Sequence, residues 1–421
     1  MRNYLKGIDR RLSRIVRVIG TEADRRGLPA YIVGGIVRDI ILGRKNLDLD
    51  IVVEGDAIAL ARKIAEARGA VVRVYPEFGT ATVEWPSGVR VDLASARRES
   101  YPYPGALPRV EKGTLRDDLF RRDFTINAMA VGINRGDFGR LVDEFGGLFD
   151  LRFREVRILH ERSFIDDPTR ILRAVRFEQR LHFRIEPGTL RLLQEALRTK
   201  AVDSVKPPRY FTEFRKMLSE ENPVDHLRRL QGLGALRLMD PAWSLDILLL
   251  KKIRRRWRRL PARLVRDYQD SRWLVYFMAN AEAIGGRRLS RILGKFPLKK
   301  EAKESILQVP AARQLLRRLA VPGLSRSGVY RILKPLAGAT AVYLRLRADD
   351  RKVADRIDRY LTRDAGIQPD INGEDLKRMG ISPGKEIGKI LSGILYQKID
   401  GKLAGRRSQL TAVEVMGYGS H

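Results

Sequence analysis

The chain has 421 residues, 44% of them hydrophobic and 32% charged, and its 82 Lys and Arg outnumber its 51 Asp and Glu to give a formal net charge of +31. This length and composition predict several folded domains, and the positive charge predicts a polyanionic partner, nucleic acid before membrane, over a merely basic background composition. The absence of cysteine excludes disulfides and cysteine-bound zinc, and the four histidines lack metal-ligand spacing. No apolar run of about 18 residues predicts a membrane span, and no secretory signal is recognised, so we expect a cytoplasmic protein.

The first 150 residues mix strand and helix signals. Five elements are predicted in chain order: a strand at 30–35, a helix at 36–43, a strand at 47–53, a helix at 57–69 and a hairpin at 80–96. The second helix should end at Gly69, because glycine commonly follows the last helical residue. The hairpin should turn at Pro86-Ser87-Gly88.

Beyond residue 150 the pattern is almost entirely helical and rich in Leu and Arg. Helix breaks are predicted at "KPPRY", "ENP", "LAVPGLS" and "QPDINGED", and no strict internal repeat is present. The sequence therefore predicts an α/β head with a mixed sheet and helices, followed by a long all-α region.

Two predicted strands of the head carry aspartates on one face. A period of two places Asp48 and Asp50 together in "NLDLDIVV", and places Asp92 opposite Val91 in "VRVDL". If the strands are neighbours, three carboxylates can converge on two metal ions about 3.5–4 Å apart, as in two-metal phosphoryl transfer. Magnesium is expected, because it prefers carboxylate oxygens, water and phosphates. For an isolated Asp-x-Asp, surface aspartates on a half-exposed strand would be the better interpretation.

A glycine pair precedes the aspartate strand. Gly34 and Gly35 link a strand to a helix, and they allow backbone N–H groups to approach a phosphate at the helix N-terminus. Arg38 lies one turn into that helix and can meet a triphosphate. The Gly-Gly turn alone is weak evidence, but with the helical arginine and the Asp-x-Asp it favours a nucleotide site.

The segment "FIDDPTRILRAVRFEQRL" combines a helix start with a series of arginines. Asp167 and Pro168 fit an N-cap and a first helical residue. One helix face would carry Asp166, Arg170 and Arg173, with Arg176 at its edge. Because buried helix faces rarely hold three arginines, this face should be solvated or should meet an anion.

Two basic segments follow in the helical region. The first, at 251–266, has nine basic residues in sixteen, and this density favours phosphate contacts over a merely solvated face. The basic residues chosen as candidate RNA contacts there are Arg254, Arg255 and Arg258. The second begins a helix with Lys385 directly after Gly384, which predicts another phosphate contact.

Four motifs appear in a characteristic order: "GGIVRDIILGRKNLDLDIVV" (34–53), "RRDFTINAMA" (121–130), "DEFGGLFDL" (143–151) and "DDPTRILRAVRF" (166–177). In this order and spacing the chain resembles the class II tRNA nucleotidyltransferase and poly(A) polymerase family, whose head is a polymerase-β-like nucleotidyltransferase. Weaker similarity at 370–391 extends the resemblance over nearly the whole chain. The resemblance implies four domains: a catalytic head at 1–150, a base-recognising helical neck at 151–210, an RNA-binding helical body at 211–330 and a tRNA-binding helical tail at 331–421.

The resemblance also implies residue roles. Asp48 and Asp50 would hold catalytic Mg²⁺, with Asp92 as a third carboxylate. Gly35 and Arg38 would contact the nucleotide phosphates, and Arg122 and Asp123 would surround the ribose. Asp167 and Arg170 would read the base, and Arg173 and Arg176 on the same helix would also bind the nucleotide. A helix with an aspartate cap and a charged entry is the alternative interpretation of "RRDFTINAMA". The family usually has glutamate where this chain has Asp166, and the shorter acid would position Arg170 less rigidly.

The chemistry of the base-reading pair predicts its preference. A carboxylate only accepts hydrogen bonds and a guanidinium only donates them. Cytosine and adenine both offer an amino donor and a ring-nitrogen acceptor, whereas guanine and uracil present the reverse. Asp167 and Arg170 can therefore satisfy C or A, and each unmet partner with G or U costs roughly 1–3 kcal/mol.

Segment 96–113 is rich in Pro, Gly and charge, and it predicts a mobile loop beside the site, with Arg97, Arg98 and Arg109. In the resembling family a loop here helps to switch from C to A addition. We therefore expect an enzyme that can add A, and full CCA addition rather than A addition alone.

Together these features predict template-independent addition of CCA to the 3′ end of tRNA, with CTP and ATP as substrates and pyrophosphate as the product. The helical region would hold the tRNA acceptor stem and elbow. Alternatives within the class are A addition, CC addition and poly(A) tailing. The rival from another class is a non-catalytic RNA-binding protein, and the presence of Asp48, Asp50, Arg122, Asp167 and Arg170 argues against it.

Overall fold

The computed structural model describes residues 2–241, 243, 245–282 and 284–416, and the chain divides into two compact units. The first unit runs to Glu213 and includes Arg229–Leu238, and the second contains Phe214–Arg228 and the chain from Met239 onward. None of the helices in the described ranges has both the length and the apolar character needed to cross a membrane. The finer division into neck, body and tail stays a prediction.

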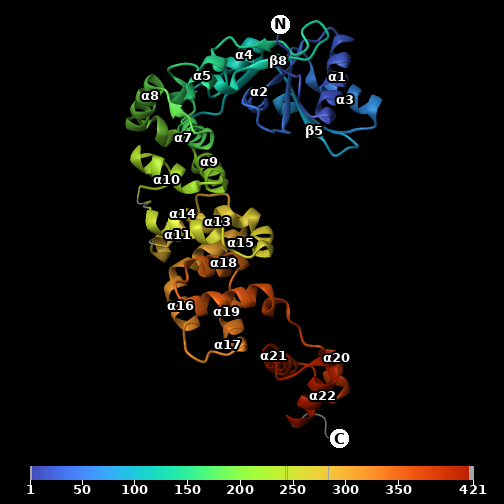
Figure 1. The fold of residues 1–421 in the computed structure, drawn as a ribbon, viewed down its shortest axis with the longest axis vertical. Helices are drawn as coiled ribbons and strands as arrows, with labels where there is room; N and C mark the ends of the chain where they lie inside the picture. The colour runs from blue at the N-terminus through green and yellow to red at the C-terminus, as the bar shows by residue number, and fades with distance from the viewer. Residues whose placement is uncertain (1, 242, 244, 283, 417–421) are drawn as a thin grey trace. The chain divides into compact units, whose positions relative to one another are not determined.

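The first unit is built on a seven-stranded mixed sheet (Figure 1). In spatial order the strands are β3 (Val71–Tyr75), β4 (Thr80–Glu84), β5 (Arg90–Ser95), β2 (Leu49–Val53), β1 (Ala30–Val33), β8 (Ala130–Gly132) and β9 (Leu141–Val142). β2 and β5 run parallel, and the other neighbours run antiparallel. β4 and β5 form the predicted hairpin, which turns where the Gly88 N–H donates to the Trp85 carbonyl. The predicted mixed-sheet head is confirmed.

The alternating pattern of these strands decides which face is buried. Leu49 and Ile51 of β2 are buried, as is Leu93 of β5, whereas Asp50 and Asp92 are exposed. The helices α1 (Arg10–Asp24) and α3 (Ala57–Arg68) pack side by side, and α3 packs against β3, β4 and β5 (Figure 1). As predicted, α3 ends before a glycine, which adopts the left-handed conformation. The apolar face is thus covered, and the aspartates occupy the other face.

Further helices extend the first unit beyond the sheet. They are α2 (Gly35–Ile41), α4 (Leu115–Phe120), α5 (Gly147–Phe153), α6 (Ser163–Asp166), α7 (Arg170–Leu181) and α8 (Pro187–Arg198), while α9 (Pro207–Ser219) and α10 (Pro223–Gly232) contain residues of both units. A short parallel pair, β10 (Glu155–Val156) with β11 (Arg184–Ile185), is an addition to the predicted all-α pattern after residue 150.

The segment 96–113 is not the loop that its composition predicts. Its strands β6 (Arg97–Ser100) and β7 (Arg109–Lys112) pair as an antiparallel ribbon. At the tip, the Gly105 N–H donates to the Ile165 carbonyl, and Arg209 donates to the Gly105 carbonyl at 2.7 Å. The two strands escape prediction because they are charged and largely exposed, so they lack the apolar alternation of a buried strand.

In its described residues the second unit is helical and contains no strand. After the residues of α9 and α10 its helices are α11 (Ile247–Trp257), α12 (Ala262–Asp267), α13 (Arg272–Ala281), α14 (Gly286–Leu293), α15 (Lys300–Leu307), α16 (Ala312–Leu319), α17 (Arg326–Leu333), α18 (Gly338–Arg347), α19 (Arg351–Thr362), α20 (Gly373–Arg378), α21 (Lys385–Ile399) and α22 (Gly405–Val415). The Phe277 ring contacts Phe214, Trp243 and Phe296 in one core. A separate apolar cluster joins α20, α21 and α22 around Leu376 and Ile394.

Candidate functional site

A cavity of about 800 Å³ opens on the aspartate face of the sheet. It is bounded by strands β2, β4 and β5, by α2, and by the start of α7. All but one of the predicted catalytic and nucleotide-binding residues line it: Gly35, Arg38, Asp48, Asp50, Asp92, Arg122, Asp123, Asp167, Arg170 and Arg173. The exception is Arg176, although Arg173, Phe177 and Arg180 of the same helix line the cavity.

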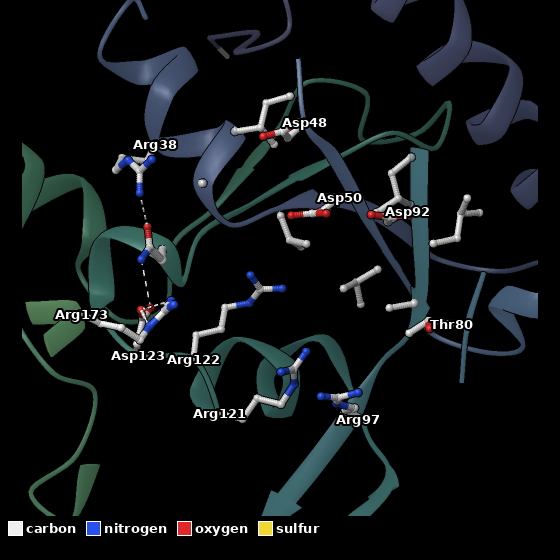
Figure 2. Close-up of a pocket in the computed structure, with 18 of the residues that line it drawn as sticks. Arg38, Asp48, Asp50, Thr80, Asp92, Arg97, Arg121, Arg122, Asp123 and Arg173 are labelled. Atoms are coloured by element: carbon white, nitrogen blue, oxygen red, sulfur yellow. Dashed lines mark hydrogen bonds and ion pairs between the residues drawn. The ribbon is translucent and has the colours of Figure 1, made fainter. Parts of the chain in front are cut away.

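Two of the three predicted metal-binding carboxylates lie directly opposite each other. Asp50 and Asp92 are register partners across the parallel pair β2–β5, and Figure 2 shows their carboxylates pointing toward one another. Thr82 donates to Asp92 Oδ1 at 2.5 Å. Asp48 precedes β2 and lines the same cavity, but in the described part of the chain no three His, Asp or Glu side chains gather as a metal site. The expected convergence of three carboxylates is therefore incomplete.

The electrostatics of the aspartate pair fit a divalent cation. The Asp50 side chain is accessible from the cavity, yet desolvation by the surrounding walls raises its pKa to about 6; Arg122 opposes this shift, and Asp92 and Asp48 add to it. Carboxylate oxygens are the protein ligands that Mg²⁺ prefers, and Mg²⁺ usually takes one or two of them and keeps water and phosphate ligands. The donor set therefore fits magnesium.

Arg122 is directed into the cavity by a buried acid. Its Nη2 donates to Asp118 Oδ2 at 2.9 Å, and Asp118 is fully buried. The guanidinium extends toward Asp50 in Figure 2, and the Arg122 Nε has no hydrogen-bond partner within the described residues. At Gly34, which has φ +79°, a Cβ would lie 2.6 Å from Arg122 Nη1, so glycine is required where this arginine passes.

Arg38 and Asp123 are engaged with other protein groups. Arg38 is 3% exposed, donates to Asp39 through Nε and Nη2, and donates through Nη1 to Asn127 Oδ1 at 2.6 Å. Burial opposes the charge of Asp123, but Arg173 and Asn127 bind its oxygens and hold its pKa below the usual value. The contact of Arg38 with phosphate and that of Asp123 with the ribose stay predictions. In such a contact, each side chain would bind the nucleotide while it is also bonded to its protein partners.

The predicted helix start needs a correction. Asp166 ends α6, and α7 begins only at Arg170 with Thr169 as its N-cap, so Asp166 is not on the same helix as the arginines. The chain is interrupted at Asp167, which has extended backbone angles and accepts hydrogen bonds from the Thr169 N–H at 3.1 Å and the Thr169 hydroxyl at 2.6 Å. Asp167 therefore caps the turn before α7, and Pro168 is not its first helical residue.

The arginines of α7 are mostly buried and meet carboxylates of the protein itself. Arg170 is 4% exposed and donates to the Ser163 hydroxyl and the Arg121 carbonyl. Arg173 pairs with Asp123, and Arg173 and Arg176 each lie 3.5 Å from Glu213. These acids lie about 40 to 50 residues away in the chain, so a local helical pattern cannot reveal them.

Sequence reasoning did not assign a role to the cavity residues of the β6–β7 ribbon. Arg97, Glu99 and Tyr101 line the cavity, and Glu99 accepts from Arg97 at 2.7 Å and from Arg121 at 3.3 Å. The Tyr101 hydroxyl donates to the other oxygen of Glu99. Their period-two spacing in "ARRESY" is the signal that could have identified one strand face.

The predicted RNA-binding residues lie in the second unit and do not line this cavity. Arg254, Arg255 and Arg258 surround a hollow of about 430 Å³ on one side of α11. On the other side, Lys252 and Arg256 pair with Asp349. Lys385 is exposed at the first position of α21.

Comparison with known proteins agrees with this arrangement. The poly A polymerase head domain matches residues 30–157, and the probable RNA and SrmB- binding site of polymerase A matches residues 182–245. An A-adding tRNA nucleotidyltransferase of Geobacter sulfurreducens is 35% identical over 407 residues, which cover 94% of this chain and 46% of the relative. The chain thus spans less than half the length of this curated relative.

Two solved structures match over nearly their full length. A CCA-adding enzyme in complex with ATP has a TM-score of 0.77 and 33% identity, covering 98% of this chain and 97% of that one. The Thermotoga maritima CCA-adding enzyme complexed with tRNA has a TM-score of 0.72 and 32% identity, with the same coverage. With the head domain matched, and at this identity and coverage, the chain belongs to the class II tRNA nucleotidyltransferase and poly(A) polymerase family.

Proposed function

We propose that this protein adds nucleotides to the 3′ end of tRNA without a nucleic-acid template, using CTP and ATP to build CCA. The observation that carries the proposal is a single cavity with an aspartate pair on one side and a base-reading pair on the other. Asp50 and Asp92 face each other on the sheet, and Asp167 and Arg170 line the same cavity at the start of α7. Family membership and the match to a CCA-adding enzyme bound to tRNA support the same reaction.

In this reaction the 3′-hydroxyl oxygen of the RNA forms a new bond to the α-phosphorus of the nucleotide. The bond from that phosphorus to the bridging oxygen breaks, pyrophosphate leaves, and the hydroxyl proton passes to solvent. Asp48 and Asp50 would hold Mg²⁺ beside Asp92, and bound Mg²⁺ supplies a lower hydroxyl pKa and stabilisation of the leaving oxygens. Arg122, whose guanidinium extends toward Asp50 in Figure 2, would bind the incoming nucleotide.

The contacts of the base-reading pair support a choice of A or C. Asp167 Oδ1 accepts from Arg209 at 2.9 Å in addition to its two bonds from Thr169. All three bonds are made by Oδ1, so Oδ2 is available to accept the amino group of adenine or cytosine. The guanidinium of Arg170 is fixed by Ser163 and the Arg121 carbonyl, which orients its remaining N–H groups.

The basic side of α11 supports tRNA as the partner. Arg255 and Arg258 are exposed, and the latter makes only a 3.3 Å pair with the highly exposed Glu221. Exposed ion pairs are weak, so these guanidinium groups can exchange a carboxylate for a phosphate at little cost. Lys385 is a second candidate contact with the RNA backbone.

A second candidate is addition of the terminal A alone, which is favoured by the A-adding activity named for the Geobacter sulfurreducens relative. The two are separated by incubating the protein with Mg²⁺, CTP and ATP and either a tRNA that ends before CCA or a tRNA that ends in CC. Full CCA addition predicts three nucleotides on the first tRNA. Extension of the CC-ended tRNA alone would select the A-adding activity, and a stop after two cytidines would contradict both. A protein that binds tRNA and extends neither would be the non-catalytic RNA-binding alternative.

A further inference from the structure

A continuous chain of hydrogen bonds joins the backbone at Asp48 to helix α7. At the Asp48 end, the Asp48 N–H donates to Asn46 Oδ1 (2.9 Å), and Asn46 Nδ2 donates to Asp39 Oδ2 (2.8 Å). In the middle, Arg38 donates through Nε to Asp39 Oδ1 (2.9 Å) and through Nη1 to Asn127 Oδ1 (2.6 Å). At the α7 end, Asn127 Nδ2 donates to Asp123 Oδ1 (3.0 Å), and Arg173 Nε donates to Asp123 Oδ2 (2.8 Å). Figure 2 shows the part that descends from Arg38 to Asp123 and Arg173. Every member lines the cavity.

The chain is continuous because two asparagines each join a donor to an acceptor. The Asn127 carbonyl oxygen accepts from Arg38, and its amide nitrogen donates to Asp123. The Asn46 carbonyl oxygen accepts from the Asp48 N–H, and its amide nitrogen donates to Asp39. An uncharged side chain with both an acceptor and a donor at its tip is required at each position, which aspartate or leucine of similar size cannot supply.

Most of this chain is shielded from water. Arg38, Asp39, Asp123 and Asn127 are between 3% and 7% exposed. In such surroundings hydrogen bonds to charged groups are strong, and a partner left without one is costly. The cost of breaking the links from Asp39 to Asp123 keeps this part in one arrangement, whereas the last link, to the Asp48 N–H, is exposed.

We propose that Asn46 and Asn127 are positioning residues that tie the base-reading helix to the backbone of Asp48. This inference rests on the proposed function, in which α7 reads the base and Asp48 holds metal. A nucleotide that binds against α7 is thereby aligned with the backbone at Asp48, whose carboxylate would hold the metal. Neither asparagine touches the reacting atoms in this role. We expect that removal of either asparagine side chain breaks this chain of hydrogen bonds and leaves the position of Asp48 less fixed.

The test compares Asn46→Ala, Asn127→Ala and the double variant. Each single change should lower kcat for A addition by about 10- to 100-fold, with KM for ATP changed by less than about threefold, as for lost supporting contacts at a metal site. Because one break already opens the chain, the double variant should be no slower than the slower single variant. Asn134→Ala is the matched control: its amide also joins a donor, the Ala30 N–H, to an acceptor, Asp24, in the same unit, but it does not line the cavity. The control should keep wild-type kcat.

Metal binding gives a second measurement that does not depend on turnover. Mn²⁺ affinity, measured by electron paramagnetic resonance without nucleotide, should fall at least about threefold in Asn46→Ala and Asn127→Ala and stay unchanged in Asn134→Ala.

Single effects on kcat that multiply in the double variant, or an unchanged Mn²⁺ affinity in Asn127→Ala, would overturn the proposal. If Asn127→Ala does not fold, Asn127→Asp has the same shape and still accepts from Arg38, but it replaces the link to Asp123 by repulsion between two carboxylates, and the same loss of Mn²⁺ affinity is expected. A wild-type protein that adds no nucleotide would refute the proposed function, while the Mn²⁺ comparison would still decide whether the chain positions Asp48.

Discussion

Two arginine-rich helices of this protein use the same side chain in different ways. On α7, Arg170 and Arg176 are buried, and Arg173 is clamped by Asp123. On α11, Arg255 and Arg258 are exposed beside a shallow hollow. The guanidinium groups of α7 are therefore held in fixed positions, whereas those of α11 carry charge but are not held in place.

The difference is set by acids that other elements supply. Asp123 precedes the 3-10 turn at Thr125–Asn127 and Glu213 lies on α9, and together they neutralise and orient Arg176, which is buried, and Arg173, which is partly buried. A buried guanidinium without such partners would be prohibitively costly, whereas an exposed one needs none. Fixed donors can discriminate one base from another, and mobile exposed charges give affinity that depends on salt.

A change at the proposed metal site in the cavity should affect nucleotide addition far more than tRNA binding. This is the largest expected difference between the two regions. Asp50→Ala should lower nucleotide addition by at least about 1,000-fold, because the charge that develops on the reacting oxygens loses its stabilisation. Affinity for tRNA, measured by filter binding, should change less than about threefold. Substantial turnover in this variant would refute the assignment of Asp50 to metal.

Stability should distinguish the buried arginines from the exposed ones. Arg173→Ala removes the guanidinium that pairs with the buried Asp123, and should lower the free energy of unfolding of the first unit by about 3 kcal/mol. Arg255→Ala should change stability by less than about 0.5 kcal/mol. Urea denaturation followed by circular dichroism measures both, and equal effects would contradict the comparison.

Base choice should depend on α7 and not on α11. Arg170→Ala should reduce discrimination against UTP and GTP by about tenfold or more, because a wrong base no longer faces an opposing donor. Arg255→Ala should leave the discrimination unchanged. Single-turnover rates with each of the four nucleotides give the ratios, and a loss of rate without a loss of discrimination would place base reading elsewhere.

The exposed arginines should govern the salt dependence of binding. Changing Arg254, Arg255 and Arg258 together to Gln should weaken tRNA binding about tenfold at about 150 mM salt, and should reduce the slope of log affinity against log salt by about 2–3. A control with the same loss of charge changes Arg287, Arg291 and Arg317 on α14 and α16. An unchanged slope in the first variant would exclude this surface from the RNA path.

The smallest expected effect is a pH-dependent gain in stability. The raised pKa of Asp50, about 6, means that the folded protein holds this proton more tightly than the unfolded chain does. The protonated Asp50 carboxyl therefore adds to the free energy of unfolding. This contribution is fully present below about pH 4 and is lost as the pH rises through about 6. In chelator at about pH 7.5, Asp50→Asn should therefore be more stable than the wild type by about 1 kcal/mol after allowance for solvent screening, and the gain should vanish below about pH 4. A gain that does not change with pH would argue against this origin.

Much of the head could be predicted because its signals are local. The alternation around Asp50 and Asp92 fixed their common face, and the turn at Gly88 fixed the hairpin that carries Asp92. Gly69 ended α3 as expected. In each case the informative residues lie within a few positions of the feature that they determine.

The remainder depends on partners that are distant in sequence. The role proposed for Asn127 is invisible locally, because Asn127 meets Arg38 across 89 positions. The burial of Arg170 and Arg176 was not expected, since the groups that satisfy them come from other elements. The β6–β7 ribbon was mistaken for a loop because its strands lack apolar alternation, and the contact that fixes its tip, Arg209 to Gly105, spans 104 positions.

The fixed ribbon tip has a consequence for the order in which the chain folds during synthesis. The Ser204 hydroxyl donates to the Pro104 carbonyl 100 positions earlier, and Arg209 reaches Gly105 across 104 positions. All the strands of the seven-stranded sheet have been synthesised by Val142, but the pairing of Asp123 must wait for Arg173, and the contacts of the ribbon tip must wait for Arg209. Contacts of such high sequence separation form late, because a long loop must first be closed. The nascent head can therefore form its sheet first, and the ribbon that carries Arg97 and Glu99 is fixed at its tip only when the start of α9 has been made.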